Sequence, residues 1–210
     1  PQASMSSPTR GLSTGRSGGS EIYFYTISTL GNGADFGETT TRRRSSASAA
    51  NAVRGLVFGG YTPSPESYTD NIDFVTLATL GNAVEFGELI TSRRGNGGCS
   101  SSTRGLIGSG TAGNPSPSFT NSVEQIQLAT TANATTFGNL NSNTRNIAGV
   151  SNATRGIFAG GDTGSKVDTI DFVTMATEGN ATDFGNLSAA ACFCAGTSNK
   201  TRGVVNIGDT

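Results

Sequence analysis

The sequence predicts an all-β protein built as a β-propeller, and three observations support that prediction. Gly, Thr, Ser and Asn make up almost half of the 210 residues, and no window places apolar residues at helical spacing. Short β-prone segments alternate with turn signals along the whole chain. The third observation is an internal repeat of about 47 residues, which is written four times and then begun again.

Two sequence motifs, which we call anchors, recur with the same period along the chain. The first is a turn in which an arginine is followed by glycine and an apolar residue, and its arginines are Arg10, Arg54, Arg104, Arg155 and Arg202. The second is a Phe-Gly pair that follows a Gly-Asn or Ala-Asn turn signal, and its phenylalanines are Phe36, Phe86, Phe137 and Phe184. Coincidence does not produce two independent anchors at one period, so the units are true repeats.

Each unit predicts four short strands. After the arginine turn comes an apolar strand that ends in paired glycines, as in residues 56–60. A loop of variable length leads to the most β-prone strand, as in residues 71–79. The Gly-Asn turn, an outer strand with the Phe-Gly pair and a small-residue strand such as 146–151 complete the unit. Four antiparallel strands at this period are typical of a propeller blade.

We expect one domain, residues 1–210, divided into a series of units. The predicted units are 1–52, 53–102, 103–153, 154–200 and a partial unit, 201–210. Counted from the small-residue strands, the chain holds four blades and a half, which do not close a ring. Either the last two strands pair with the first blade or with another subunit, or the chain is part of a longer one. We expect the longer chain.

The composition argues against several classes of function. Lys and Arg together number 14 against 15 for Asp and Glu, so the basic surface of a nucleic-acid binder is not expected. No apolar run approaches 18 residues, so no membrane insertion is expected. Histidine is absent, which weighs against most enzymes. We therefore predict no enzyme activity, no catalytic residues, no metal site and no cofactor, and we interpret Cys99, Cys192 and Cys194 as buried thiols.

The repeat resembles the kelch repeat. In that comparison an arginine early in the first strand is matched by Arg43, Arg93 and Arg145, and the phenylalanine of each Phe-Gly pair stands where kelch has a tryptophan. The sequence departs from the pattern in three respects: it has no tryptophan, Ala191 and Cys192 stand at the arginine position of the fourth unit, and the glycine pair of the first unit is scrambled at residues 15–19.

Three segments of the repeat are similar to those of a narrower group of proteins. The strings at residues 99–106, 169–174 and 179–185 resemble kelch-like repeats in virion structural proteins of tailed phages, especially marine and cyanobacterial ones. The resemblance implies a non-enzymatic protein on the surface of the virion, in a tail fibre or as capsid decoration. It implies other virion proteins or copies of the chain itself as partners.

Strand direction assigns the connections to two faces. The arginine turns and the Gly-Asn turns lie on one face, whereas the variable loops and the links between blades lie on the other. These loops carry Tyr61, Tyr68 and Phe119, so we predict that any ligand, such as a host-surface glycan, binds there. The alternative is that the loops vary because nothing constrains them.

The repeat positions themselves have a structural and a functional interpretation. The turn arginines could form a ring that captures an anionic sugar or phosphate. We favour a structural role, in which each arginine caps backbone groups or pairs with a carboxylate such as Asp73 or Asp171. The phenylalanines of the Phe-Gly pairs are expected to pack the blades together.

Two other function classes stay open. One is a lectin-like propeller, secreted or displayed by a bacterium, whose loops bind glycans. The other is a glycoside hydrolase that works with carboxylates alone, which needs no histidine.

Overall fold

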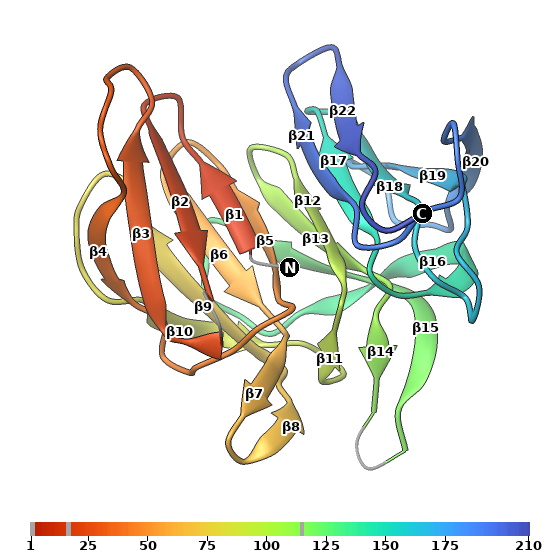
Figure 1. The fold of residues 1–210 in the computed structure, drawn as a ribbon, viewed down its shortest axis with the longest axis horizontal. Coiled ribbons are helices and arrows are strands. Elements are labelled where there is room, and N and C mark those ends of the chain that lie inside the picture. The colour runs from red at the N-terminus through yellow and green to blue at the C-terminus, as the bar shows by residue number, and fades with distance from the viewer. Residues whose placement is uncertain (1–2, 16–17, 114–115) are drawn as a thin grey trace.

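The computed structural model confirms an all-β propeller of four blades and describes residues 3–15, 18–113 and 116–210. These ranges contain strands and turns without an α-helix. Each blade is an antiparallel sheet in which neighbours in the chain are neighbours in space, apart from the inserted hairpin of the second blade and two short additional strands in the third. The sheets stand side by side in an arc, from β4 (Ala34–Glu38) at one end to the half-sheet of β21 (Ala195–Ser198) and β22 (Gly203–Asn206) at the other (Figure 1).

The strands of the first two blades follow the predicted order. Blade 1 comprises β1 (Ala3–Ser6), β2 (Arg10–Thr14), β3 (Glu21–Thr26) and β4 (Ala34–Glu38). Blade 2 comprises β5 (Ala47–Ala50), β6 (Arg54–Phe58), β9 (Asn71–Thr76) and β10 (Val84–Glu88). The variable loop of blade 2 forms a separate hairpin of β7 (Tyr61–Pro63) and β8 (Glu66–Tyr68).

Blades 3 and 4 repeat this order. Blade 3 comprises β12 (Gly97–Ser100), β13 (Arg104–Gly108), β15 (Ser118–Gln127) and β16 (Thr135–Thr144), extended by β11 (Arg93–Arg94) and β14 (Thr111–Ala112). Blade 4 comprises β17 (Ala148–Ser151), β18 (Arg155–Ala159), β19 (Thr169–Thr174) and β20 (Thr182–Asn186). A half-sheet of β21 (Ala195–Ser198) and β22 (Gly203–Asn206) follows. Each sheet thus begins one strand before the arginine turn that opens the predicted unit.

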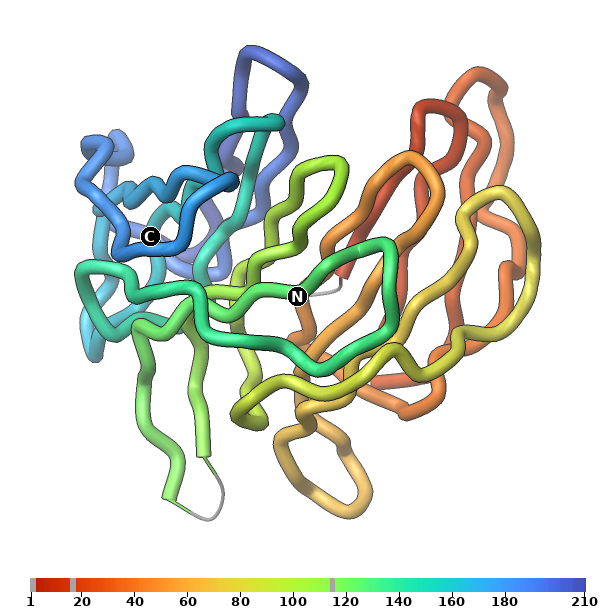
Figure 2. Tube along the Cα trace, turned by 180° about the vertical axis from the view of Figure 1, so that it is seen from behind, coloured from red at the N-terminus to blue at the C-terminus, as the bar shows by residue number. Residues whose placement is uncertain are grey.

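The small-residue strands form the inner edge of every sheet, around the central axis. Their short side chains let neighbouring blades approach closely, and serine hydroxyls join them. Ser100 Oγ donates to the carbonyl of Ala50, Ser151 Oγ to that of Ser100 and Ser198 Oγ to that of Ser151, each at 2.7 Å. Seen from behind, the blades follow one another from blade 1 at the right to blade 4 at the left (Figure 2). The inner strands therefore align the blades in register.

The hydrophobic core lies between the sheets. The cluster between blades 2 and 3 contains Leu56, Phe58 and Ile72 from one sheet and Ile107 and Leu128 from the next, all fully buried. Similar clusters fill the junctions between blades 1 and 2 and between blades 3 and 4. The sheets of blades 2 and 3 are thus apolar on both faces, as sheets in the middle of a stack require.

The paired glycines at the end of the second strand turn the chain into the loop. Gly59 and Gly60 have φ values of 61° and 114°, a region that side chains with a Cβ disfavour. This turn brings the N–H of Gly60 to the carbonyl of Arg93 in the next link, at 2.7 Å. Ser109 occupies the first of these positions in blade 3 at φ 67°.

The half-sheet packs against β17 of blade 4. In the described ranges no strand pairs it with blade 1, and β22 pairs only with β21. The outer part of blade 4 therefore has no neighbouring strand where blades 1 to 3 each have the next sheet.

Candidate functional site

The two ends of the propeller axis differ in the connections that they carry. In Figure 1 the tip between β21 and β22 points up, whereas the β7–β8 hairpin and the strand β14 point down. We call the end with the hairpin and the links between blades the loop face, and the opposite end the turn face.

The turn arginines lie in the junctions between blades. Arg10 Nη1 donates to the carbonyl of Leu77, and Arg104 Nη1 to that of Met175, each at 2.8 Å. Arg54 Nη1 donates to the carbonyl of Leu128 at 3.0 Å. Each bond reaches from one blade to the following one. These three guanidinium groups also lie over the rings of Phe24, Phe74 and Phe137.

The last two turn arginines have different surroundings. Arg155 is exposed and stacks on Phe172, with 4.9 Å from Cζ to the ring centroid. Arg202, in the half-sheet, is also exposed. The expected partner carboxylates belong to other contacts, because Asp73 pairs with Arg43 and Asp171 binds Asn141.

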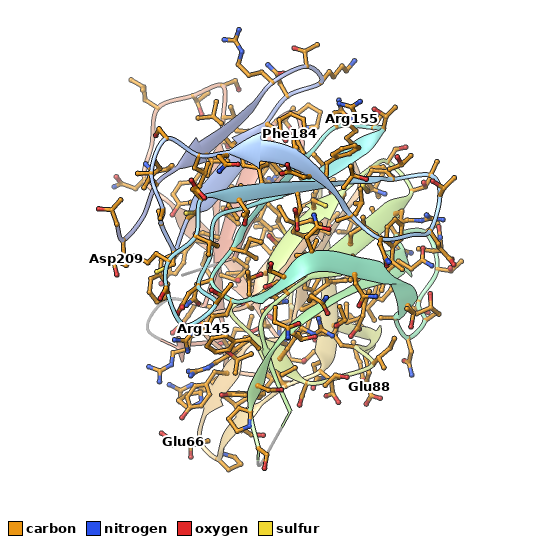
Figure 3. All side chains as sticks on the ribbon, turned by 90° about the vertical axis from the view of Figure 1, so that its right-hand side faces the viewer. Glu66, Glu88, Arg145, Arg155, Phe184 and Asp209 are labelled. Atoms are coloured by element: carbon orange, nitrogen blue, oxygen red, sulfur yellow. The ribbon has the colours of Figure 1, made fainter. Side chains whose placement is uncertain are left out.

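The phenylalanines of the Phe-Gly pairs divide into two groups. Phe36, Phe86 and Phe137 are 3% exposed and belong to the clusters between sheets. Phe184 is 50% exposed, so the expectation that it packs between blades is wrong. Its repeat position is the same, but among the described residues no strand covers the outer part of blade 4. Figure 3 shows Phe184 near Arg155, far from Glu66 at the tip of the hairpin.

Two buried ion pairs were missed by the sequence analysis. Arg43 Nη2 lies 2.6 Å from Asp73 Oδ2, and Arg93 pairs with Glu124 in the same way one blade later. Each of these side chains is at most 2% exposed. Nη1 of Arg43 also donates to the carbonyl of Asn71, at 2.9 Å. Each arginine thus ties a link between blades to the third strand of the blade that it enters.

Burial dominates the electrostatics of these pairs. It lowers the pKa of the Arg43 and Arg93 guanidinium groups and raises the pKa of the Glu124 carboxyl, while the opposite charges oppose those shifts. An arginine nonetheless keeps its proton in proteins. The pairs are structural, because water has no access to either partner.

The match of Arg145 to Arg43 and Arg93 is wrong. Seven residues separate Phe36 from Arg43, and the same count from Phe137 reaches Thr144. Thr144 is buried and contacts Ser109, whereas Arg145 lies one position later, at 34% exposure, and pairs with Asp162 at 2.8 Å. Counting from the Phe-Gly pair would have found the correct position.

The shifted position defines a second arginine series on the loop face. Its members, one from each of three links, are Arg44, Arg94 and Arg145. Each lies over an aromatic ring that the sequence analysis placed in the ligand-binding loops. The distances from Cζ to the ring centroid are 4.8 Å for Arg44 over Tyr61, 5.2 Å for Arg94 over Tyr68 and 4.5 Å for Arg145 over Phe119.

A cavity of about 590 Å³ opens beside this series, between the links of blades 3 and 4 and the half-sheet. Its wall includes Arg94, Arg145, Lys166, Asp162, Asp209 and Phe193. Arg145 and the N–H of Gly164 both bind Asp162, and the bond from Gly164 is the larger cause of the lowered pKa of that carboxyl. The wall therefore combines fixed charges of both signs with one aromatic side chain.

The chemistry available elsewhere is limited. No three His, Cys, Asp or Glu side chains in the described ranges gather as metal ligands. Cys99, Cys192 and Cys194 are buried free thiols, and burial raises the pKa of Cys99 to about 12. The described part of the chain contains no helix of the length and apolar character needed to span a membrane.

No protein-family model matches the chain, and no curated protein does. Among solved structures, that described as "Structure of YjhT" is similar, with a TM-score of 0.77 and 11% sequence identity. The match covers 95% of this chain and 70% of that one. At this identity the likeness shows the fold alone: the chain shares a β-propeller architecture with that protein.

Proposed function

We propose that the protein is a non-enzymatic contact module of a phage virion, in a tail fibre or as capsid decoration, and that its loop face meets the partner. The repeat sequence supports the assignment to a virion, because the segments at 99–106, 169–174 and 179–185 resemble kelch-like repeats of virion proteins. The partners are other virion proteins or copies of this chain, together with a host-surface glycan.

The observation that carries the contact role is the series of stacked arginines and aromatic rings on the loop face. Tyr61 and Tyr68 pack edge to face, with 6.2 Å between centroids, and Arg94 lies over both rings. Side chains that are already ordered lose little conformational entropy when they bind. Tyrosine and arginine are also the residues most enriched at the energetic centres of interfaces.

The scaffold supports this role because it is rigid beneath the loops. The buried pair of Arg93 and Glu124 anchors the link that carries Arg94, and the carbonyl of Arg93 binds the N–H of Gly60 beside the hairpin. Contact side chains held on such a base can keep one arrangement without a ligand.

The location is tested by immunogold labelling of purified phage particles with an antibody against this chain. We expect gold on the tail or on the capsid surface. Particles that lack the chain would overturn the assignment to a virion and would favour the alternative, a bacterial lectin-like propeller.

The contact face is tested by cell adhesion of the Tyr61→Ala/Tyr68→Ala double variant. We expect a loss of at least about tenfold, with the melting temperature nearly unchanged. Tyr25→Ala is the matched control, because Tyr25 is 44% exposed but lies on β3 opposite Gly11, at the turn-face end of blade 1. Equal losses in both variants would contradict a role of the loop face. Incubation with the bound glycan should release no reducing ends.

A further inference from the structure

The cavity on the loop face has the dimensions of a ligand site. Its volume of about 590 Å³ lies within the range of small-molecule pockets, about 300–1,000 Å³. Its wall comes from the links between blades and from residues that directly follow the paired glycines, including Thr111 and Asp162. Backbone bonds hold these segments, since Asp162 and Arg145 bond through both N–H and carbonyl groups at 3.0 and 3.1 Å. The cavity is thus part of the rigid scaffold.

The charges of the wall leave one cation without a counter-charge. Arg145 pairs with Asp162, and Lys166 Nζ lies 3.0 Å from Asp209 Oδ1. In the described ranges Arg94 has no carboxylate within ion-pair distance. One positive charge therefore remains to be matched by a ligand.

The guanidinium of Arg94 is held in position by two rings. Its Cζ lies 5.4 Å from the centroid of Tyr61 and 5.2 Å from that of Tyr68. A guanidinium that stacks on aromatic rings through its faces can still bind a ligand through its N–H edge. That edge matches the two oxygens of a carboxylate in a bidentate arrangement.

Phe193 contributes an aromatic surface at a position where the backbone disfavours it. Its φ is 53°, and the equivalent residues in earlier links are Ser45, Gly95 and Asn146, which are smaller. The ring is 48% exposed and lines the cavity. The N–H of Phe193 bonds to the carbonyl of Asn146 at 2.9 Å, a bond that any residue except proline can make. The fold does not require the ring, so this strained aromatic residue points to a ligand.

We propose that the cavity binds a saccharide unit that bears a single carboxylate, such as a uronic acid. The inference rests on the proposed contact function of the loop face and names its ligand class. The carboxylate supplies the one missing negative charge at Arg94. The apolar side of the sugar ring matches Phe193, and Ser45, Thr111 and Asn146 on the wall offer hydroxyl and amide groups to the sugar hydroxyls. An inorganic anion would satisfy the charge but would leave most of the volume and the aromatic surface unused.

The test measures calorimetric binding of a galacturonic acid trimer, with its methyl ester and inorganic phosphate as comparison ligands. We expect the trimer to bind and both other ligands to bind at least about tenfold more weakly, because the ester lacks the charge and phosphate lacks the ring. Phosphate that binds as tightly as the trimer, or an ester that binds equally well, would overturn the proposal.

Three variants locate the site on the intact chain. Arg94→Gln should weaken trimer binding at least about tenfold, while Arg42→Gln, an exposed arginine outside the cavity, should not change it. Phe193→Asn removes the ring and relieves the left-handed backbone, so we expect weaker binding together with an equal or higher melting temperature. Unchanged binding in Arg94→Gln or Phe193→Asn would contradict the site.

The outcome separates the ligand class from the wider function. If the trimer does not bind while the Tyr61→Ala/Tyr68→Ala variant still loses adhesion, the saccharide proposal fails and the contact face stands. If adhesion does not depend on the loop face but the trimer binds through Arg94, the proposed contact face fails and the saccharide site stands.

Discussion

Phe86 and Phe184 occupy the same repeat position in two regions of the molecule, yet 3% of the first side chain and 50% of the second are exposed. The difference lies in the neighbour. Blade 3 covers Phe86, whereas no strand in residues 3–15, 18–113 and 116–210 covers the outer part of blade 4, which is followed by the two-stranded half-sheet. One motif thus has two energetic roles, decided by whether the next sheet is complete.

The junction between blades 2 and 3 shows what the outer side of blade 4 lacks. The Ala132–Asn133 turn of blade 3 sits directly on Gly87 of the Phe-Gly pair. Asn133 Oδ1 accepts from the N–H of Glu88 at 3.1 Å, and the N–H of Ala134 donates to the carbonyl of Glu88 at 2.8 Å. The complete junction is held by packing and backbone bonds together.

The largest difference between the two regions is expected from removal of the ring. Phe86→Ala should destabilise the fold by about 3–5 kcal/mol, because it leaves a cavity in the core. Phe184→Ala should cost only about 1 kcal/mol, since half of its surface is already in water. Urea denaturation measures both. Equal costs would mean that Phe184 is covered in solution.

Removal of the buried arginine should have an effect nearly as large on the complete junction. Arg93→Ala leaves the carboxylate of Glu124 buried without its partner, which costs about 3–5 kcal/mol. The double variant Arg93→Met/Glu124→Leu removes both charges and should recover most of that loss. A double variant as unstable as the single one would show that the backbone bonds of Arg93, not its charge, hold the link.

A methyl group on the glycine of the Phe-Gly pair probes how closely the next blade approaches. At Gly87 a Cβ would lie 2.5 Å from the carbonyl oxygen of Ala132, whereas at Gly185 it would meet nothing within 4 Å. Both residues have positive φ, at 155° and 139°, so each alanine carries a backbone cost of about 1 kcal/mol. Gly87→Ala should cost clearly more, because the blades must also separate. Thermal unfolding of the two variants decides this, and matching melting temperatures would refute the close approach.

The smallest difference is expected for the turn arginines. Arg54→Ala loses two hydrogen bonds to carbonyls of blade 3, at 3.0 and 2.9 Å, and should cost about 1–3 kcal/mol. Arg155→Ala loses a stacking contact on Phe172 in solvent and should cost about 0.5–1 kcal/mol. Chemical denaturation of both variants measures the contrast. A larger loss for Arg155→Ala would indicate that its guanidinium has a further partner.

The predicted architecture depended on features that are local or periodic. The alternation of β-prone segments with turns, the glycine pairs and the two anchors were enough to predict four blades, their strand order and the two faces. The loop aromatics Tyr61, Tyr68 and Phe119 were also placed on the correct face, because strand direction alone decides where each connection lies. Their role in binding stays a prediction.

The partners that the arginine side chains contact could not be predicted from the sequence. Asp73, Glu124 and Asp171 each precede a Phe-Gly phenylalanine by 13 residues, which marks one position on the third strand. Which group reaches that carboxylate depends on the path of the link before the blade. Arg43 and Arg93 reach it, while Asn141 takes the contact at Asp171. Sequence spacing alone does not distinguish these cases.

The sequence by itself determined the strands, their period and the apolar faces, because backbone conformation and side-chain alternation depend on neighbours in the chain. The tertiary structure decided which repeat positions are buried and which cations are left without a partner. Burial depends on whether another sheet arrives from a distant part of the chain, so identical motifs at Phe86 and Phe184 end in different surroundings. In the same way, the position of Arg94 between two tyrosines exists only after the hairpin and the link have met.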